Sequence, residues 1–279
     1  MEKITSRRNQ LCVHIKKLGA SRSYREECGQ FLCDGIKLLE DAADSGAEII
    51  YVITSKGIPI PLPVETKVFF ADSGVIDSIS PLKTAQDTLF VCKMPRYSEL
   101  SAVLSQPPDG EDERLGEAQP GMSGGSGSGS GNGRGTYVLL DGMQDPGNVG
   151  AIIRTANALG VDAILLTDGC ADPYNPKTIR ATMGAIFRQK ICRLDVTGLT
   201  ALRENGIKII GAVAGADSKK VTDTDLRNSV IAIGSEGGGL SDEILALCGE
   251  KVSIPMAAGC ESLNASVAAA IIIWEAQRS

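Results

Sequence analysis

The order of apolar and polar positions divides the chain into two regions with different patterns. Up to about residue 97, short apolar segments alternate with segments of helical spacing, in which Leu11, Ile15 and Leu18 share one face. The predicted helices cover 5–18 and 35–45, and the predicted strands cover 30–33, 49–54, 67–71 and 88–93. Such an alternation over roughly 90 residues predicts a small α/β domain.

From Thr136 the alternation of strands and helices becomes more regular. The predicted strands cover 137–140, 163–167, 191–194, 208–213, 230–233 and 251–254, and the predicted helices cover 149–159, 177–187, 199–205 and a last segment that runs into Trp274. These strands are continuously apolar, which predicts a mainly parallel sheet with helices on both faces. The last helix carries Ala and Ile on nearly all sides, so we expect it to be buried on more than one face.

The segment between these regions loses all apolar periodicity. It passes from the acidic QPPDGEDERLGEAQPG into the Gly/Ser run MSGGSGSGSGNGRG. A run of this composition is too polar to pack and predicts a flexible tether. The predicted organisation is therefore a first domain over 1–97, a linker over 98–135 and a second domain over 136–279, without one fixed orientation of the two domains.

Composition excludes several classes of protein. With 43% hydrophobic and 22% charged residues the chain is typical of globular domains. Its longest purely apolar run, 267–274, is far shorter than the ~20 residues that span a bilayer, and the polar N-terminus predicts no secretory signal. Eight cysteines without a CxxC pair favour reduced thiols in the cytoplasm over disulfides or a zinc site. The single histidine, His14, excludes a multi-histidine metal site and is expected at the surface or in packing.

The net charge of −6 is unevenly distributed. The linker is acidic, whereas the first 25 residues contain a basic set. This set is Lys3, Arg7, Arg8, Lys16, Lys17, Arg22 and Arg25. Taken alone, it favours a solvated helix face over a nucleic-acid contact surface, and the sequence leaves both interpretations open.

Polar and glycine-rich segments follow four predicted strands of the second domain. They are DGMQDPGNVGAIIRTA, DGCADPYNP, GSEGGGL and PMAAGCESLNAS. Ligands of open α/β sheets bind at the carboxyl ends of strands, so we expect these loops to form one crevice. Ser262, Asn264 and Ser266 at the start of the last helix fit either a helix cap or a ligand site.

Two nucleotide-binding motifs and one hydrolase arrangement are excluded. The first loop lacks G-x-G-x-x-G, and GSEGGGL lacks both that spacing and a following Lys-Ser/Thr pair. A Ser-His-Asp triad would need His14, which lies in the other predicted domain. A dinucleotide fold, a P-loop NTPase and a serine hydrolase are therefore not expected.

Three motifs in this order and spacing are recognisable as a set. They are NVGAIIRTA with Asn148 and Arg154, IAIGSEGGGLS with Gly234 and Glu236, and VSIPMAAGCESLNASVAAAIIIWEA with Ile254, Met256, Ser262, Leu263 and Asn264. Over 136–279 the chain resembles the SpoU (TrmH-type) branch of the SPOUT RNA ribose methyltransferases. It departs from the family in its long tether and in Ser235, where the family often has Asn.

The resemblance implies an α/β fold with a trefoil knot, a homodimer, and S-adenosylmethionine as cofactor. FLCDGIKLLEDA and the strands after it resemble the ribosomal-protein-like RNA-binding domain often fused ahead of this catalytic domain, which implies that the first domain selects the RNA. The implied activity is methylation of a ribose 2′-hydroxyl, with ribosomal RNA as the favoured substrate. A tRNA substrate, and a non-catalytic RNA-binding protein of the same fold, are the alternatives.

The same resemblance assigns roles to nine residues. Gly234, Ile254, Leu263 and Met256 would bind the cofactor, and Arg154, Asn148, Glu236, Ser262 and Asn264 would serve catalysis. A guanidinium is almost always protonated, so we expect Arg154 to clamp a phosphate and stabilise the forming alkoxide rather than act as a base. Glu236 would orient Arg154 or Asn148, and Ser262 and Asn264 would shape the substrate pocket. The structural alternatives are a turn glycine (Gly234), core aliphatics (Ile254, Leu263), helix caps (Asn148, Ser262) and a surface ion pair (Arg154).

Overall fold

The computed structural model describes residues 2–82, 85–95, 135–215, 217–260 and 262–278. By its contacts the chain divides into a first unit (1–96, 144–155 and 171–189) and a second unit (97–143, 156–170 and 190–279). The predicted linker over 98–135 lies outside the described residues apart from Gly135. The predicted domain boundaries stay a prediction, but two segments that follow the linker in sequence, 144–155 and 171–189, group with the N-terminal sheet.

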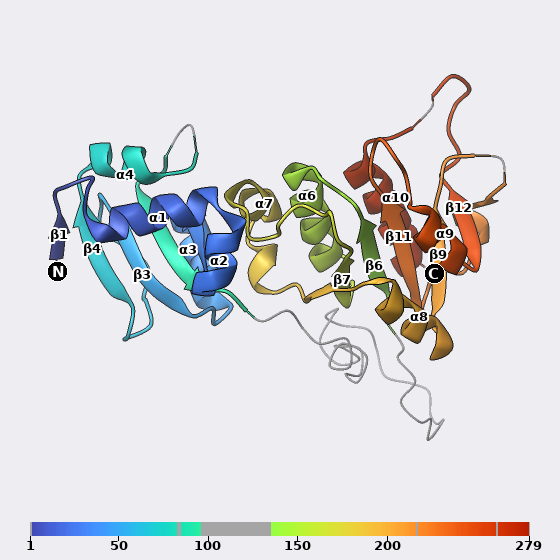
Figure 1. Ribbon diagram of the computed structural model, residues 1–279, viewed down its shortest axis with the longest axis horizontal. Coiled ribbons are helices and arrows are strands. Elements are labelled where there is room, and N and C mark those ends of the chain that lie inside the picture. Colours follow the sequence, from blue (N-terminus) through green and yellow to red (C-terminus); the bar gives the residue numbers. More distant parts are fainter. Residues whose placement is uncertain (1, 83–84, 96–134, 216, 261, 279) are drawn as a thin grey trace, which may run out of the picture. The chain divides into compact units, whose positions relative to one another are not determined.

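The first unit contains a five-stranded mixed sheet in the order β1-β4-β3-β5-β2. The strands are β1 (Glu2–Ile4), β2 (Gln30–Asp34), β3 (Ile49–Thr54), β4 (Lys67–Ala71) and β5 (Thr88–Lys93) (Figure 1). β5 is antiparallel to β2 and β3, whereas β4 is parallel to β1 and β3. The four predicted strands are confirmed to within one residue. The prediction missed β1, a three-residue strand with two exposed residues, which the sequence does not mark as apolar.

Helices pack on this sheet through apolar faces. They are α1 (Gln10–Ala20), α2 (Arg22–Cys28), α3 (Ile36–Asp44), α4 (Ser73–Ile79) and α7 (Pro176–Thr182), with the short η1 (Ala185–Phe187). α1 begins at Gln10, later than predicted, because the Asn9 side chain accepts the Leu11 N–H at 2.9 Å and caps the helix there. The predicted helix over 177–187 is interrupted, since Met183 (φ 48°) and Gly184 (φ 86°) adopt left-handed backbone after α7.

Two N-terminal side chains are held within the first unit. His14 lies 2.8 Å from both the Tyr24 hydroxyl and the Gln30 amide oxygen, which confirms a packing role. Arg25, counted above in the basic set, is 1% exposed on α2. The basic surface therefore lacks Arg25, because this guanidinium faces inward to a buried carboxylate described below.

The second unit contains a seven-stranded sheet in the order β10-β12-β9-β11-β6-β7-β8, and every strand pair in it is parallel. The strands are β6 (Tyr137–Asp141), β7 (Ala163–Leu166), β8 (Ile191–Arg193), β9 (Lys208–Ala212), β10 (Lys219–Lys220), β11 (Ser229–Gly234) and β12 (Glu250–Ser253). The predicted α/β class and parallel sheet are confirmed. The trefoil knot stays a prediction.

Further helices and one short 3-10 turn complete the described part of the second unit, and α6 begins in the first unit and ends in the second. They are α6 (Pro146–Ala158), α8 (Val196–Glu204), η2 (Val221–Asp223), α9 (Asp242–Leu247) and α10 (Ala265–Arg278). α10 buries Ala269, Ile272 and Ala276, among others, but leaves an apolar stripe exposed at Val267 (48%), Ile271 (37%) and Trp274 (58%). The expectation of burial on more than one face is wrong for the chain alone. None of the described helices is both long and apolar enough to cross a membrane.

Candidate functional site

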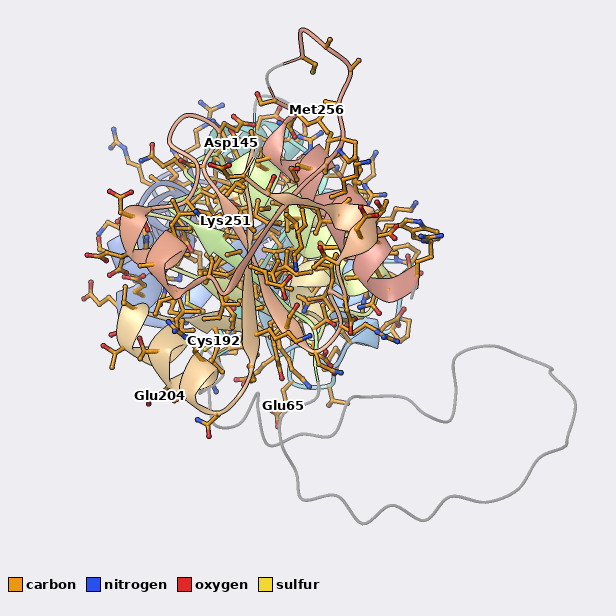
Figure 2. The ribbon with its side chains drawn as sticks, turned by 90° about the vertical axis from the view of Figure 1, so that its right-hand side faces the viewer. Glu65, Asp145, Cys192, Glu204, Lys251 and Met256 are labelled. Carbon is orange, nitrogen blue, oxygen red and sulfur yellow. The ribbon has the colours of Figure 1, made fainter. Side chains whose placement is uncertain are left out.

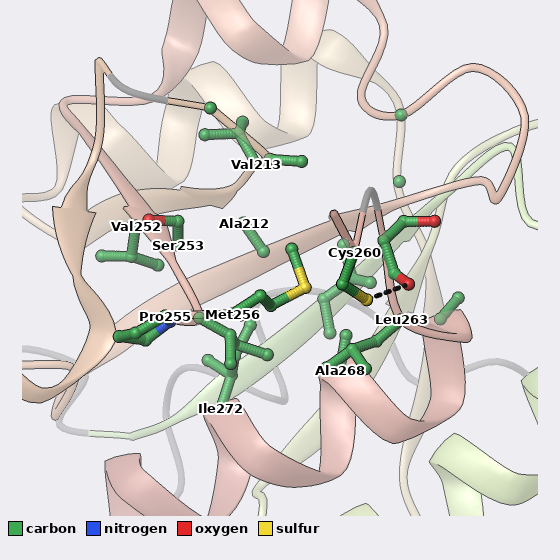
Figure 3. A pocket seen from close by; sticks show the side chains of 18 of the residues that line it. Ala212, Val213, Val252, Ser253, Pro255, Met256, Cys260, Leu263, Ala268 and Ile272 are labelled. Carbon is green, nitrogen blue, oxygen red and sulfur yellow. Dashed lines mark hydrogen bonds between the residues drawn. The ribbon is translucent and has the colours of Figure 1, made fainter. Parts of the chain in front are cut away.

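A pocket of about 570 Å³ lies in the second unit at the carboxyl ends of three neighbouring strands, β12, β9 and β11. Its walls are the segments that follow these strands, and the first turns of α10 close it (Figure 3). In Figure 2 Met256, just after β12, lies at the top of the unit, and Glu204, which ends the helix before β9, lies at the bottom. The volume lies within the ~300–1,000 Å³ of pockets for small molecules and cofactors.

The segment after β11 forms one wall through a tight turn. The Ser235 N–H donates to the Gly239 carbonyl at 3.0 Å, and the Gly239 N–H donates to the Ser235 carbonyl at 2.9 Å. A Cβ on Gly234 would lie 2.0 Å from the Gly239 carbonyl carbon, so only glycine fits there. Gly234 is thus a turn glycine, as the structural alternative expected. The same turn also places Glu236 at the pocket.

The opposite wall and the floor are apolar. Ile254, Met256 and Leu263 line the pocket after β12, and Ala268 and Ile272 of α10 continue it. Ile254 and Leu263 are half-buried and Met256 is 37% exposed, so these side chains present apolar surface to the pocket rather than complete a core. Figure 3 shows the Met256 side chain extending into the space between Pro255 and Cys260.

The polar end of the pocket is fixed by Asn264. Its Nδ2 donates a 2.7 Å hydrogen bond to Glu236 Oε1. Its Oδ1 accepts the Ser266 N–H at 3.0 Å and the Ser266 hydroxyl at 2.6 Å, and so caps α10. Ser262 lies exposed on the pocket lining, and the capping role proposed for it belongs to Asn264 instead.

Asn148 and Arg154 lie on α6, in the part that belongs to the first unit. Asp145 caps this helix, since its Oδ1 accepts the Asn148 N–H at 2.8 Å. The Asn148 side chain is therefore not the cap, and it is 8% exposed. Arg154 is exposed and forms no ion pair with any residue that the structure describes, so the surface ion pair is not its role there.

The structure thus brings six of the nine predicted site residues to one pocket. They are Gly234, Glu236, Ile254, Met256, Ser262 and Leu263. Asn264 bonds to Glu236, and Asn148 and Arg154 share α6. Of the four loops expected to form one crevice, those after β11 and β12 line this pocket, while those after β6 and β7 lead into segments of the first unit.

Sequence reasoning missed the segment after β9. Val213, Ala214 and Gly215 line the pocket. Val213 ends a predicted strand, and Ala214 and Gly215 follow it as the other four loops follow their strands. It also missed Asp141 at the end of β6. This carboxylate is 8% exposed, accepting the Ser241 N–H at 2.7 Å and the Thr167 hydroxyl at 2.9 Å. The position of Asp141 at a strand end was the available signal, and its bonds hold the segment after β11 to β6 and β7.

Three thiols of the second unit, those of Cys170, Cys192 and the partly buried Cys248, are not poised as nucleophiles. Burial raises the pKa of Cys170 and of Cys192, and it raises the pKa of Cys248 to about 11. The thiolate is the reactive form of cysteine, and these thiols are protonated at neutral pH. Chemistry at this unit therefore depends on positioning and hydrogen bonding rather than on a covalent cysteine intermediate at these three positions.

Comparison with known proteins places the chain in a family. Residues 135–274 match the SpoU rRNA Methylase family. A 23S rRNA (guanosine(2553)-2′-O)-methyltransferase of Bacillus subtilis is 28% identical over 98% of both chains, and an uncharacterized tRNA/rRNA methyltransferase of Synechocystis is 30% identical over 99% of this chain and 93% of its own. The crystal structure of an AdoMet-bound rRNA methyltransferase from Sinorhizobium meliloti superposes with a TM-score of 0.79 at 27% identity, covering 99% of this chain and 97% of that one. Since the match covers the pocket and the predicted site residues of all three motifs, this chain belongs to the SpoU rRNA methylase family.

Proposed function

We propose that this chain transfers a methyl group from S-adenosylmethionine to a ribose 2′-hydroxyl of ribosomal RNA. The observation that carries the proposal is the meeting of the second and third motifs at one pocket, at the carboxyl ends of β12, β9 and β11. The 23S rRNA 2′-O-methyltransferase relative and the AdoMet-bound structural neighbour, both similar over nearly the whole chain, support it.

The lining of the pocket fits this cofactor. Ile254 and Leu263 supply apolar walls for an adenine ring, and the backbone groups at Gly234 and Ile254 supply donors and acceptors for its edge. The Glu236 carboxylate at the pocket wall complements a cationic sulfonium ligand. When bound, the cofactor supplies a methyl group activated by the positive sulfur.

Acceptance of that methyl group requires an oriented 2′-hydroxyl, which is weakly acidic. A charged donor stabilises the negative charge that develops on the oxygen, and it also clamps the neighbouring phosphate. Arg154 is the residue that we assign to this role, because its guanidinium is exposed on α6 and always charged. Asn148, six residues earlier on the same helix, contributes amide hydrogen bonds to the substrate.

Glu236 and Asn264 act as one unit at the polar end of the pocket. The 2.7 Å bond between them fixes the carboxylate, and the capping bonds of Asn264 tie this arrangement to the start of α10. Ser262, exposed on the lining, is available to shape the substrate side of the pocket. In this proposal Asn264 orients Glu236, and Glu236 orients the groups that meet the RNA.

The first unit is proposed to select the RNA. Several members of the basic set are engaged on their own unit: Lys3 pairs with Asp72 at 3.3 Å and Arg22 with Glu26 at 2.9 Å. Arg8 and Lys16 are exposed and remain the basic side chains that we assign to phosphate contact. A tRNA substrate is the alternative within the same chemistry, supported by the tRNA/rRNA designation of the Synechocystis relative.

A homodimer and a cytoplasmic location complete the proposal. Val267, Ile271 and Trp274 follow each other by four and three residues, so they form one apolar stripe on the exposed side of α10. A second copy of the chain would bury this stripe, which explains why the helix is apolar on nearly all sides.

Radiolabelled methyl transfer to size-fractionated total RNA tests the substrate. We expect label from S-adenosylmethionine in the large rRNA fraction. Label confined to tRNA would keep the chemistry and reverse the choice of substrate. Binding of S-adenosylmethionine without any transfer to RNA would favour the non-catalytic RNA-binding protein.

A further inference from the structure

A buried ion pair joins α2 to the segment 171–189 within the first unit. Arg25 Nε and Nη2 both donate to Asp172 Oδ2, at 2.9 and 2.6 Å, and Arg25 Nη1 donates to the Leu18 carbonyl at 2.5 Å. The two side chains are 2% and 8% exposed. Each buried charge is thus compensated by the other and by further hydrogen bonds, the condition under which such a pair is retained in an interior.

Asp172 organises the chain that enters α7. Its Oδ1 accepts the Tyr174 N–H at 2.9 Å. Its carbonyl accepts the Asn175 N–H at 3.0 Å and the Thr178 hydroxyl at 2.9 Å, and Thr178 is fully buried. Beside it Phe31 of β2 packs against Tyr174, with ring centroids 5.0 Å apart. The start of α7 is therefore fixed to the N-terminal sheet by directional bonds as well as by apolar packing.

α7 in turn touches α6 at backbone distance. A Cβ on Gly150 would lie 2.5 Å from the Ala181 Cβ and 2.5 Å from the Thr178 carbonyl oxygen. Only a glycine lets the two helices approach so closely, so a shift of α7 must be transmitted to α6. Arg154 lies four residues after Gly150, about one turn further along α6. Figure 1 shows α7 between α2 and α6.

We infer that Arg25 and Asp172 are positioning residues for methyl transfer: through α7 they hold the part of α6 that carries Asn148 and Arg154. The inference rests on the role proposed for Arg154. It gives the N-terminal unit a part in the reaction step in addition to RNA selection. None of the described residues that line the cofactor pocket belongs to this unit, so the pair is expected to affect turnover and not cofactor affinity.

The test compares Asp172→Asn with Asp87→Asn. Both remove one carboxylate of an ion pair in the first unit, but the pair of Asp87 with Lys56 is exposed, and neither partner belongs to α6 or α7. For Asp172→Asn we expect kcat to fall at least about tenfold, with KM for RNA and the calorimetric Kd for S-adenosylmethionine within about twofold of the wild type. Asp87→Asn should keep all three values. An unchanged kcat in Asp172→Asn would overturn the inference.

Hydrogen exchange supplies a readout that does not depend on activity. In Asp172→Asn, peptides from 144–155 and 171–189 should exchange faster, whereas peptides from β9, β11 and α10 should not. Faster exchange throughout the chain would mean general destabilisation and would contradict a local role. If Asp172→Asn fails to fold, Arg25→Lys is compared with Arg25→Met, because lysine keeps the positive charge and one donor group. We expect a higher kcat in Arg25→Lys than in Arg25→Met. Equal kcat in the two variants would refute a role of the directional bond to Asp172.

These outcomes separate the inference from the function on which it rests. Wild-type protein without methyl transfer to any RNA would remove the proposed function. Active wild-type protein with a fully active, normally exchanging Asp172→Asn would remove only the positioning role.

Discussion

The side chain of Asn264 connects the start of α10 to Glu236, the acidic residue in the turn after β11. Its Nδ2 donates to Glu236 Oε1 at 2.7 Å while its Oδ1 caps the helix. The Asn264 amide thus donates to the pocket residue Glu236 through Nδ2 and caps α10 through Oδ1. Substitutions that remove only one of the two functions separate catalysis from stability.

Asn264→Asp keeps an oxygen acceptor for the cap but replaces the donor to Glu236 by a second carboxylate. We expect it to retain most of the helix stability, whereas Asn264→Ala loses about 1 kcal/mol of unfolding free energy. Both variants should lose turnover to a similar degree, because both lose the bond to Glu236. Thermal unfolding and methyl-transfer rates measure the two effects. Normal turnover in Asn264→Asp would show that the bond to Glu236 is not needed.

Gly234→Ala should damage the pocket through the backbone. The added Cβ meets the Gly239 carbonyl carbon at 2.0 Å, so the turn that carries Glu236 must move. We expect the calorimetric Kd for S-adenosylmethionine to rise by roughly tenfold or more, equivalent to about 1.4 kcal/mol. Gly237→Ala is the matched control, because a Cβ at Gly237 meets nothing within 4 Å. Equal affinities of the two variants would argue against this turn as a cofactor wall.

Arg154→Ala should abolish most of the turnover. Loss of one charged donor at a developing oxyanion lowers kcat by about 10²–10³-fold. Cofactor affinity should stay within about twofold, because Arg154 does not line the pocket. The control is Arg203→Ala on α8, which lies outside all three motifs and does not line the pocket. Near-normal kcat in Arg154→Ala would remove this residue from the mechanism.

Trp274→Asp should separate the proposed dimer. Trp274 is 58% exposed at the end of the α10 stripe, and a charge there would have to be buried at an interface. Light scattering after size exclusion should give a dimer for the wild type and a monomer for the variant. Val196→Asp, at a 37% exposed position on α8, should remain dimeric. A wild-type monomer, or a dimeric Trp274→Asp, would rule out this interface.

Thiol alkylation at pH 8 should modify Cys260 faster than Cys170, Cys192 and Cys248. Cys260 is exposed and lines the pocket. A raised pKa means less thiolate at a given pH, so Cys170, Cys192 and Cys248 should react more slowly, and Cys248 should speed up only as the pH approaches about 11. Peptide mass analysis identifies the modified residue, and S-adenosylmethionine should slow the reaction at Cys260. Lack of protection would place the cofactor elsewhere.

Much of the fold follows from the apolar pattern. β3, β4 and β5 agree with the predicted strands at both ends, because their apolar residues are consecutive. The 177–187 helix was predicted as continuous because periodicity does not register the left-handed residues at Met183 and Gly184. Arg25 was assigned to a basic surface because a sequence does not show that a guanidinium meets a carboxylate 147 residues away.

The candidate site was predictable where motifs carried it. Gly234, Glu236, Ile254 and Leu263 came from their motifs and line one pocket. The grouping of 144–155 and 171–189 with the N-terminal sheet was not predictable, since it depends on the Arg25–Asp172 pair and on the approach of two helices at Gly150. A truncation that removes residues 1–95 would therefore also remove the sheet with which 144–155 and 171–189 group.

The position of the transferred methyl group tests the central claim most directly. RNA labelled from S-adenosylmethionine is digested to nucleosides, which are separated and identified by mass. We expect the label in a 2′-O-methylated nucleoside from large rRNA, and we expect Arg154→Ala to abolish it. Label on a base, with none on ribose, would contradict ribose 2′-O-methylation by this protein.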